Sequence, residues 1–318
     1  MLLSPEPMHI PDGFLSVLVS AFFWLLTLIF VGIAVNRSKD TLKDRQIPLM
    51  GIMAAFIFAA QMINFPVAGG TSGHLLGGAL AAIVLGPWSG ILVMTSVIAL
   101  QGLMFQDGGL VVMGANIFNM GILTAMIGYG LYAAVARQKH KGVQVGVIGI
   151  AAWLSVMASA LVASFQIWLS GTSPARVVFP AMLSVHMLIG IGEALITIAA
   201  FSFIRQVRPD ILENKQTAAK NNAGWIIVGG LISLGVVLLS PFASADPDGL
   251  ERVAADVGFL SLAQDTPYKI FADYVIPALG DGGFSTAVAG IIGILAVGGI
   301  AFLIGWIIQK TKAKGSTP

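Results

Sequence analysis

Long apolar segments separated by short polar loops dominate the chain. A membrane-spanning helix needs about 20 apolar residues, and on this pattern we assign nine membrane segments. They cover residues 14–35, 48–65, 74–85, 91–105, 110–136, 143–169, 177–203, 225–239 and 284–308. The pattern therefore predicts an all-α integral membrane protein.

The third segment, residues 74–85, is too short to cross a bilayer. At helical rise it covers about 18 Å, against about 30 Å of hydrocarbon. It follows the Gly-rich stretch PVAGGTSG, and irregular backbone at membrane depth must line a cavity or contact protein. We expect this loop to enter the body and to bury His74 on the outer side, where the N-terminal segment can meet it.

The distribution of basic residues predicts the orientation. Fourteen of the 17 Lys and Arg residues fall where alternating spans place them on one side of the membrane. These residues lie in the ranges 37–45, 137–141, 205–220 and 310–314. Because basic residues gather in cytoplasmic loops, we expect an outside N-terminus and a cytoplasmic C-terminus in a bacterial or archaeal cytoplasmic membrane.

A polar stretch, RPDILENKQTAAKNN, divides the chain. We predict a seven-helix body over residues 1–208 and a cytoplasmic linker over 209–223. Residues 224–318 then form a two-helix accessory module. Its two helices are joined by an acidic external loop, residues 243–283, which contains the sequence PDGLE.

Composition narrows the possible chemistry. Apolar residues make up 57% of the chain and charged residues 10%, against about 25% charged residues in a soluble domain. There is no cysteine, which excludes disulfides, iron–sulfur clusters and thiolate sites. Any metal must be held by His, Met, carboxylate or backbone groups. The sequence also contains no GxxxxGK[ST] phosphate loop, so it lacks an ATP-binding part of that kind.

The sequence MHIPDG, residues 8–13, suggests a metal site. A histidine at position two of a chain can chelate a metal through the α-amine, its own deprotonated amide nitrogen and its imidazole. His9 has this position if the chain starts at Met8, which we favour over removal of the first seven residues or a different geometry. The imidazole of His74 would complete a planar four-nitrogen site, which suits Ni²⁺ or Cu²⁺. The alternative is a pair of interfacial histidines without a ligand.

Two ionisable residues lie inside the seventh segment, where they are costly and often functional. His186 and Glu193 are seven residues apart, so they face the same side of a helix. They form either a relay or inner metal station, or a buried structural pair. In the second segment, Gly51, Ala55 and Ala59 form a small-residue stripe, which is either an internal contact or a docking face.

Three motifs together resemble one family. They are MHIPDGFLS at 8–16, GGTSGHLLGG at 69–78 and MGANIFNMG at 113–121. They are similar to the cobalt/nickel substrate-binding component of energy-coupling-factor transporters, the CbiM/NikM family. The C-terminal part resembles the small PDGLE-type accessory subunit, CbiN/NikN-like, fused in frame.

The resemblance implies a metal-capture subunit that transports Ni²⁺ or Co²⁺, without a bound cofactor and without enzyme activity. It places the metal ligands at Met8, His9 and His74. It also implies a coupling transmembrane protein and two cytoplasmic ATPases as partners. We slightly favour nickel. The alternative function is a self-sufficient secondary metal transporter with His186 and Glu193 as its proton-coupling pair.

Overall fold

The protein is mainly helical in its computed structural model, which describes residues 9–138, 140–208 and 224–315. Seven helical segments of these ranges are long and apolar enough to cross a membrane. They are α1 (Val17–Thr41), α4 with η1 (Pro87–Phe105), α5 with η2 and α6 (Met113–Val135), α7 (Lys141–Leu169), α8 (Ala175–Val207), α10 with η3 (Gly224–Phe242) and α12 (Gly283–Gly315). The predicted all-α membrane fold is confirmed.

Two shorter helices complete the predicted set. They are α2 (Gln46–Gln61) and α3 (Gly78–Leu85). Helix α3 starts at Gly78 rather than at the predicted His74, because residues 74–77 take an irregular path before it. Helix α4 (Pro87–Leu100) starts with Pro87 at its first position, where the missing N–H of proline costs nothing.

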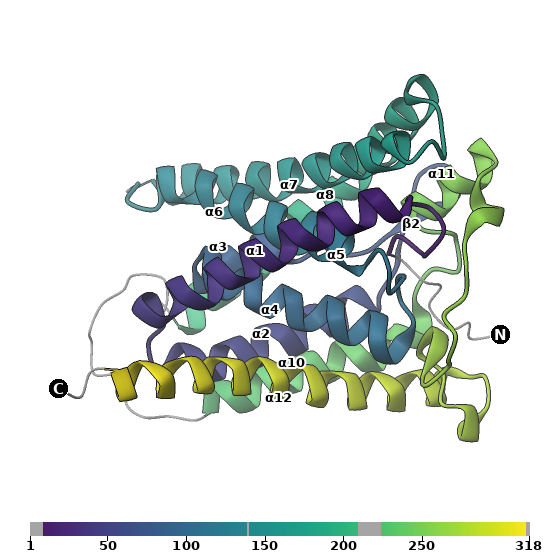
Figure 1. Cartoon of the computed structure of the whole chain (residues 1–318). Helices are drawn as coiled ribbons and strands as arrows, with labels where there is room; N and C mark the ends of the chain where they lie inside the picture. Colours follow the sequence, from purple (N-terminus) through teal and green to yellow (C-terminus); the bar gives the residue numbers. More distant parts are fainter. Residues whose placement is uncertain (1–8, 139, 209–223, 316–318) are drawn as a thin grey trace.

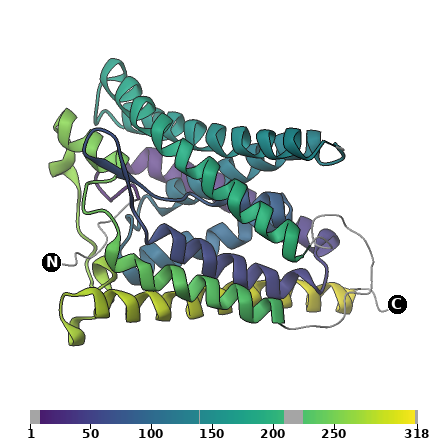
Figure 2. The same cartoon turned by 180° about the vertical axis from the view of Figure 1, so that it is seen from behind.

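The helices run side by side in layers (Figures 1 and 2). Helices α6, α7 and α8 form one side, and α10 and α12 pack along α2 on the opposite side. Helices α3 and α4 lie between these layers, where α3 contacts both α4 and α6. Buried apolar residues of α2, α3 and α4 form the largest part of the main core cluster.

The small-residue stripe of α2 is an internal contact. A Cβ atom added at Gly51 would lie 2.8 Å from the carbonyl oxygen of Gly298 on α12. Ala55 also lies against Gly298. The stripe therefore lets the last helix approach α2 at backbone distance, as small residues do between membrane helices.

Several short elements gather at one end of the helices (Figure 1). Strands β1 (Phe65–Val67) and β2 (Thr71–Gly73) form an antiparallel hairpin, which the hydrophobic pattern of the sequence did not predict. Helix α11 (Gly249–Val257) lies in the segment expected as a loop, and the side chain of Asp248 caps it by accepting from the N–H of Glu251 at 2.7 Å. The other short turns are η4 (Leu260–Leu262), η5 (Ala272–Tyr274) and η6 (Pro277–Leu279).

Two spans contain π-helical turns near this end. They are η1 (Gln101–Phe105), which ends α4, and η2 (Ile117–Leu123), which lies between α5 (Met113–Asn116) and α6 (Thr124–Val135). Such turns are rare and are frequently found at functional sites. The loop between these two spans, residues 106–112, faces the N-terminal segment.

Candidate metal centre

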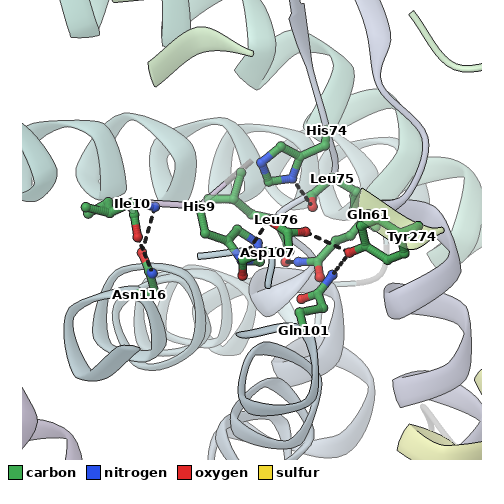
Figure 3. Close-up of polar contacts among 10 residues, drawn as sticks. All are labelled: His9, Ile10, Gln61, His74, Leu75, Leu76, Gln101, Asp107, Asn116 and Tyr274. Atoms are coloured by element: carbon green, nitrogen blue, oxygen red, sulfur yellow. Dashed lines mark hydrogen bonds and ion pairs between the residues drawn. The ribbon is translucent and has the colours of Figure 1, made fainter. Parts of the chain in front are cut away.

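The structure brings His9 and His74 together. Both are buried, with 3% and 7% of their surface exposed. Their ring centroids lie 5.8 Å apart with the rings nearly edge to face. Figure 3 shows His9 in contact with Asp107 and His74 in contact with Leu75. Met8, the third predicted ligand, lies outside the described residues.

The hydrogen bonds of the two imidazoles involve Nδ1 and leave Nε2 of each ring available. His9 Nδ1 lies 3.0 Å from the backbone oxygen of Asp107 and 3.5 Å from its Oδ1. His74 Nδ1 lies 3.0 Å from the backbone oxygen of Leu75. When Nδ1–H donates in this way, the lone pair is on Nε2. His9 Nε2 is buried and has no hydrogen-bond partner among the described residues.

The environment keeps His74 neutral. His74 lies in the irregular segment before α3, and burial together with the nearby His9 lowers the pKa of its imidazole from 6.5 to about 4. Desolvation disfavours the charged form of a histidine. At neutral pH the His74 side chain is therefore in the unprotonated form that metal binding requires.

Asp12 ties the N-terminal segment to the body. Its carboxylate accepts hydrogen bonds from three successive backbone N–H groups of the 106–112 loop, at 2.9, 2.9 and 3.1 Å. The next residue, Gly13, has φ +94°, and a Cβ there would collide with the backbone of Leu262. Asp12 thus fixes the N-terminal segment on the 106–112 loop, and Gly13 allows its close approach to Leu262.

Asn116 fixes the residue next to His9. Its side-chain oxygen accepts from the N–H of Ile10 at 3.1 Å, and its NH₂ group donates to the carbonyl of Ile10 at 3.0 Å. Asn119 instead makes two hydrogen bonds with Gln166 of α7, at 2.8 and 2.9 Å. The MGANIFNMG motif therefore contributes one clamp for the N-terminal segment and one contact between helices.

Glu193 holds the segment that carries His74. Its two carboxylate oxygens accept from the N–H groups of Leu76 at 2.6 Å and Gly77 at 3.0 Å. An acid at a helix N-terminus also interacts favourably with the helix dipole. Gln61 donates to the carbonyl of Leu76 at 2.9 Å. These contacts favour the structural interpretation of Glu193.

His186 lies on the same helix but has a different partner. Its Nδ1 is 2.8 Å from the backbone oxygen of Met182, one turn earlier on α8. It lines a cavity of about 60 Å³ together with His9 and His74. Three imidazoles thus face one small cavity, although no group of three or more His, Asp or Glu side chains in the described ranges is arranged to hold a metal ion.

A wider pocket of about 250 Å³ adjoins this cavity and shares His9, Asp248 and Leu250 with it. The C-terminal module supplies most of its lining. The charged members of that lining are Asp248, Glu251, Asp265, Lys269 and Asp273. Burial raises the pKa of the Asp248 carboxyl to about 8. The pocket thus reaches His9 and is lined by more acidic than basic side chains.

Some site residues were not found from the sequence. Asp12 and Asp107 each lie in an Asp-Gly pair, which indicates a turn but not a contact with His9. Tyr274, whose hydroxyl donates to Asp107 at 2.7 Å, carries no motif at all. The capping pair Asp248 and Glu251, three residues apart, is a recognisable helix start and could have predicted α11.

Comparison with known proteins agrees with this architecture. Residues 9–211 match the family described as "Cobalt uptake substrate-specific transmembrane region", CbiM. Residues 223–310 match the PDGLE domain. A crystal structure described as a truncated transition metal transporter superposes with a TM-score of 0.57 at 31% identity, covering 63% of this chain and 99% of that one.

Full-length relatives have both parts in one chain. A putative fused nickel transport protein NikMN from Archaeoglobus fulgidus is 35% identical over 93% of this chain and 98% of its own length. A probable fused nickel transport protein LarMN from Lactiplantibacillus plantarum is 33% identical over 74% of both chains. The chain therefore belongs to the CbiM family of metal transport proteins, in the form fused to a PDGLE domain, and is a multi-pass membrane protein.

Proposed function

We propose that this chain is the metal-capture subunit of an ATP-driven energy-coupling-factor importer for Ni²⁺ or Co²⁺, with nickel favoured. The observation that carries the proposal is the meeting of His9 and His74. Both imidazoles are buried, and that of His74 is held neutral. The backbone contacts that fix the two rings use Nδ1 and leave Nε2 of each ring for a metal ion. Desolvated neutral imidazoles suit Ni²⁺ and Co²⁺ as ligands.

The proposed ligands are Met8, His9 and His74. His9 and His74 supply imidazoles, and Met8 supplies its amine when it is the first residue. The amine–amide–imidazole chelate closes its six-membered ring through Nδ1 of His9. In the observed orientation Nδ1 faces Asp107, so the chelate requires the imidazole to turn, whereas binding through Nε2 does not.

Magnetic measurement of the Ni²⁺-loaded chain separates these arrangements. A planar four-nitrogen chelate makes Ni²⁺ diamagnetic, whereas ligation through imidazole Nε2 with oxygen donors leaves it paramagnetic. Intact-mass measurement of the same sample gives the first residue of the mature chain. A chain that starts at Met8 and binds diamagnetic Ni²⁺ supports the chelate.

We further propose that the end carrying His9 faces outward and that the end carrying the basic loops faces the cytoplasm. The body would then span residues 1–208, with a cytoplasmic linker at 209–223 and the accessory module at 224–318. A coupling transmembrane protein and two cytoplasmic ATPases would complete the importer. The absence of a GxxxxGK[ST] loop from this sequence supports separate ATPases.

The binding test compares three forms of the purified full chain by calorimetric titration with Ni²⁺ and with Co²⁺. We expect His74→Ala to abolish high-affinity binding and His140→Ala, at an exposed loop residue, to leave it unchanged. Retained affinity in the His74 variant would overturn the proposed site.

The energy source is tested by uptake into vesicles. Co-reconstitution with the coupling protein and ATPases should give uptake that needs ATP. Uptake by this chain alone, driven by a proton gradient without ATP, would instead favour the secondary transporter.

A further inference from the structure

An apolar groove separates the C-terminal module from the body. It lies between α8 of the body, α10 of the module and α2, on the side of the molecule that Figure 2 shows. Its volume is about 430 Å³, and it shares no lining residue with the cavity of His9 and His74. Helix α8 packs mainly on α7, whereas α10 packs on α2 and α12. Side chains of both parts, such as Phe203 of α8 and Val228 of α10, therefore face the groove across a gap.

The groove has the length of one bilayer leaflet. On α8 its lining extends from Ile196 to Arg208, which is about 18 Å at helical rise. Half of the hydrocarbon core measures about 15 Å. The groove opens at the end where α8 ends and where α2 and α10 begin, and on α10 it extends only to Ile232, halfway along the helix. An acyl chain from one leaflet has this reach.

The groove has a single cationic group, and this group lies at its mouth. Arg208 is the one charged residue among the described residues that line it. The guanidinium carbon lies 4.6 Å from the ring centroid of Trp225, at the start of α10. Tryptophan is enriched at the membrane–water interface, which places this pair at the depth of the lipid headgroups. A guanidinium stacked on a ring can also donate its in-plane N–H groups to a phosphate.

These features define the chemistry of a ligand. Ligand pockets commonly have volumes of about 300–1,000 Å³ and apolar walls with a few polar groups that fix orientation. A long apolar groove with one cation at the interface complements a hydrocarbon chain with an anionic head. Arg37 and Arg45 lie at the same end of the molecule, where α1 ends and α2 begins. Basic pockets between membrane helices on the cytoplasmic side are typical sites for anionic lipid headgroups.

We propose that this groove binds one anionic phospholipid, with an acyl chain between α8 and α10 and its phosphate at Arg208. The bound lipid joins the module to the body at the end of the molecule opposite to His9. This inference goes beyond the proposed function and does not depend on it. A ligand that binds only the folded state stabilises that state, so the lipid raises the stability of the joined parts.

The test uses the purified full chain after removal of bound lipid. Phosphatidylglycerol or phosphatidylcholine with the same acyl chains is added, and retention is measured by native mass spectrometry and by thermal unfolding. We expect one phosphatidylglycerol to be retained per chain and to raise the unfolding temperature. Its affinity should exceed that of phosphatidylcholine about fivefold, as one basic residue near an anionic headgroup provides.

Ala199→Trp tests the position of the acyl chain. Ala199 is exposed on α8 and lines the groove, so an indole there occupies the groove without entering the core. Ala134→Trp, at an exposed position of α6 outside the groove, is the matched control. We expect Ala199→Trp to abolish lipid retention and Ala134→Trp to leave it unchanged.

Arg208→Gln tests the position of the phosphate and leaves the groove open. We expect the affinity for phosphatidylglycerol to fall about fivefold, to that of phosphatidylcholine. Arg205→Gln is the control, because Arg205 lies one turn earlier on α8 but donates to Gln144 of α7 at 3.3 Å and does not line the groove. It should keep the preference for phosphatidylglycerol. Circular dichroism and size-exclusion chromatography verify that each variant is folded.

Three results would overturn the inference. The first is no retained phospholipid on the unaltered chain, and the second is equal affinity for the two lipids. The third is unchanged lipid retention in Ala199→Trp. If this variant kept the lipid but no longer assembled with the coupling protein, the groove would be a protein-docking surface instead. Titration of the unaltered chain with Ni²⁺ tests the proposed function separately.

Discussion

At the scale of single residues, the site depends on polar groups that hold two imidazoles in place. Asp12 and Asn116 bind backbone groups around His9, while Glu193 binds backbone groups after His74. These side chains satisfy buried N–H and C=O groups, which are costly to leave unpaired. The same contacts therefore stabilise the fold and position the two imidazoles.

The lowered pKa of His74 predicts how stability depends on pH. An unfolded chain protonates this histidine below 6.5, whereas the folded chain resists protonation down to about 4. The folded state thus binds fewer protons between these values, so its stability falls as pH falls from 6.5 to 4. The full loss from this group is about 3 kcal/mol.

Thermal unfolding of the metal-free chain between pH 7.5 and 4.5 measures this loss. His74→Gln removes the titrating group and should flatten the profile, whereas His140→Gln, at an exposed site, should leave it as steep as in the unaltered chain. Equal slopes in all three proteins would contradict the prediction.

At the scale of elements, the sequence predicted the helices but not their interruptions. Apolar length locates all nine segments, because each must match a bilayer or a packed interior. It cannot locate the hairpin of β1 and β2, whose strands are only three residues each. It also cannot show that residues 74–77 form an irregular path, since that path depends on Glu193 from a distant helix.

The approach of His9 to His74 was predictable, because it also follows from the lengths of the apolar segments. The short third segment and its glycines required a buried loop, and the N-terminal segment lies on the same side. Tyr274 and Asp107 were not predictable, because their contact joins residues 167 positions apart and neither lies in a periodic pattern. Long-range polar contacts leave little trace in a single sequence.

The position of Glu193 at the start of α3 predicts the effect of Glu193→Gln. An amide presents an NH₂ group where two backbone N–H donors require acceptors, so the start of α3 loses part of its hydrogen bonding. Loss of such contacts to a buried group costs about 1–3 kcal/mol. We expect a lower unfolding temperature in the metal-free chain and weaker Ni²⁺ binding through displacement of His74.

Ser184→Ala, an exposed position on the same helix, serves as the control and should change neither quantity. An unchanged unfolding temperature in Glu193→Gln, together with loss of metal binding, would instead support a direct role of this carboxylate as a ligand.

At the scale of the whole molecule, the C-terminal module contacts the proposed metal site. Helix α12 packs along α2. The loop before it brings Asp248 and Leu250 to the cavity that the two histidines line, and Tyr274 to Asp107. The backbone of Gln264 pairs with Asp12, and that of Ser72 with Asp248. Both segments that carry a proposed ligand thus contact the module directly.

This arrangement predicts that the docking of α12 on α2 affects the distant site. In Gly298→Leu the new side chain must enter the contact with Gly51, where even the Cβ would lie 3.2 Å from the Gly51 oxygen. Overpacking of this kind costs about 1–3 kcal/mol. Displacement of α12 would move the segment that holds Tyr274, so we expect both the unfolding temperature and the Ni²⁺ affinity to fall.

The neighbouring Gly299 provides a matched control, because no atom lies within 4 Å of a Cβ added there. Gly299→Leu has the same change in helix propensity and in apolar volume, but it points away from α2. It should leave stability and affinity close to those of the unaltered chain. If Gly298→Leu lowered stability without changing Ni²⁺ affinity, the module would be anchored through α12 independently of its contact with His9.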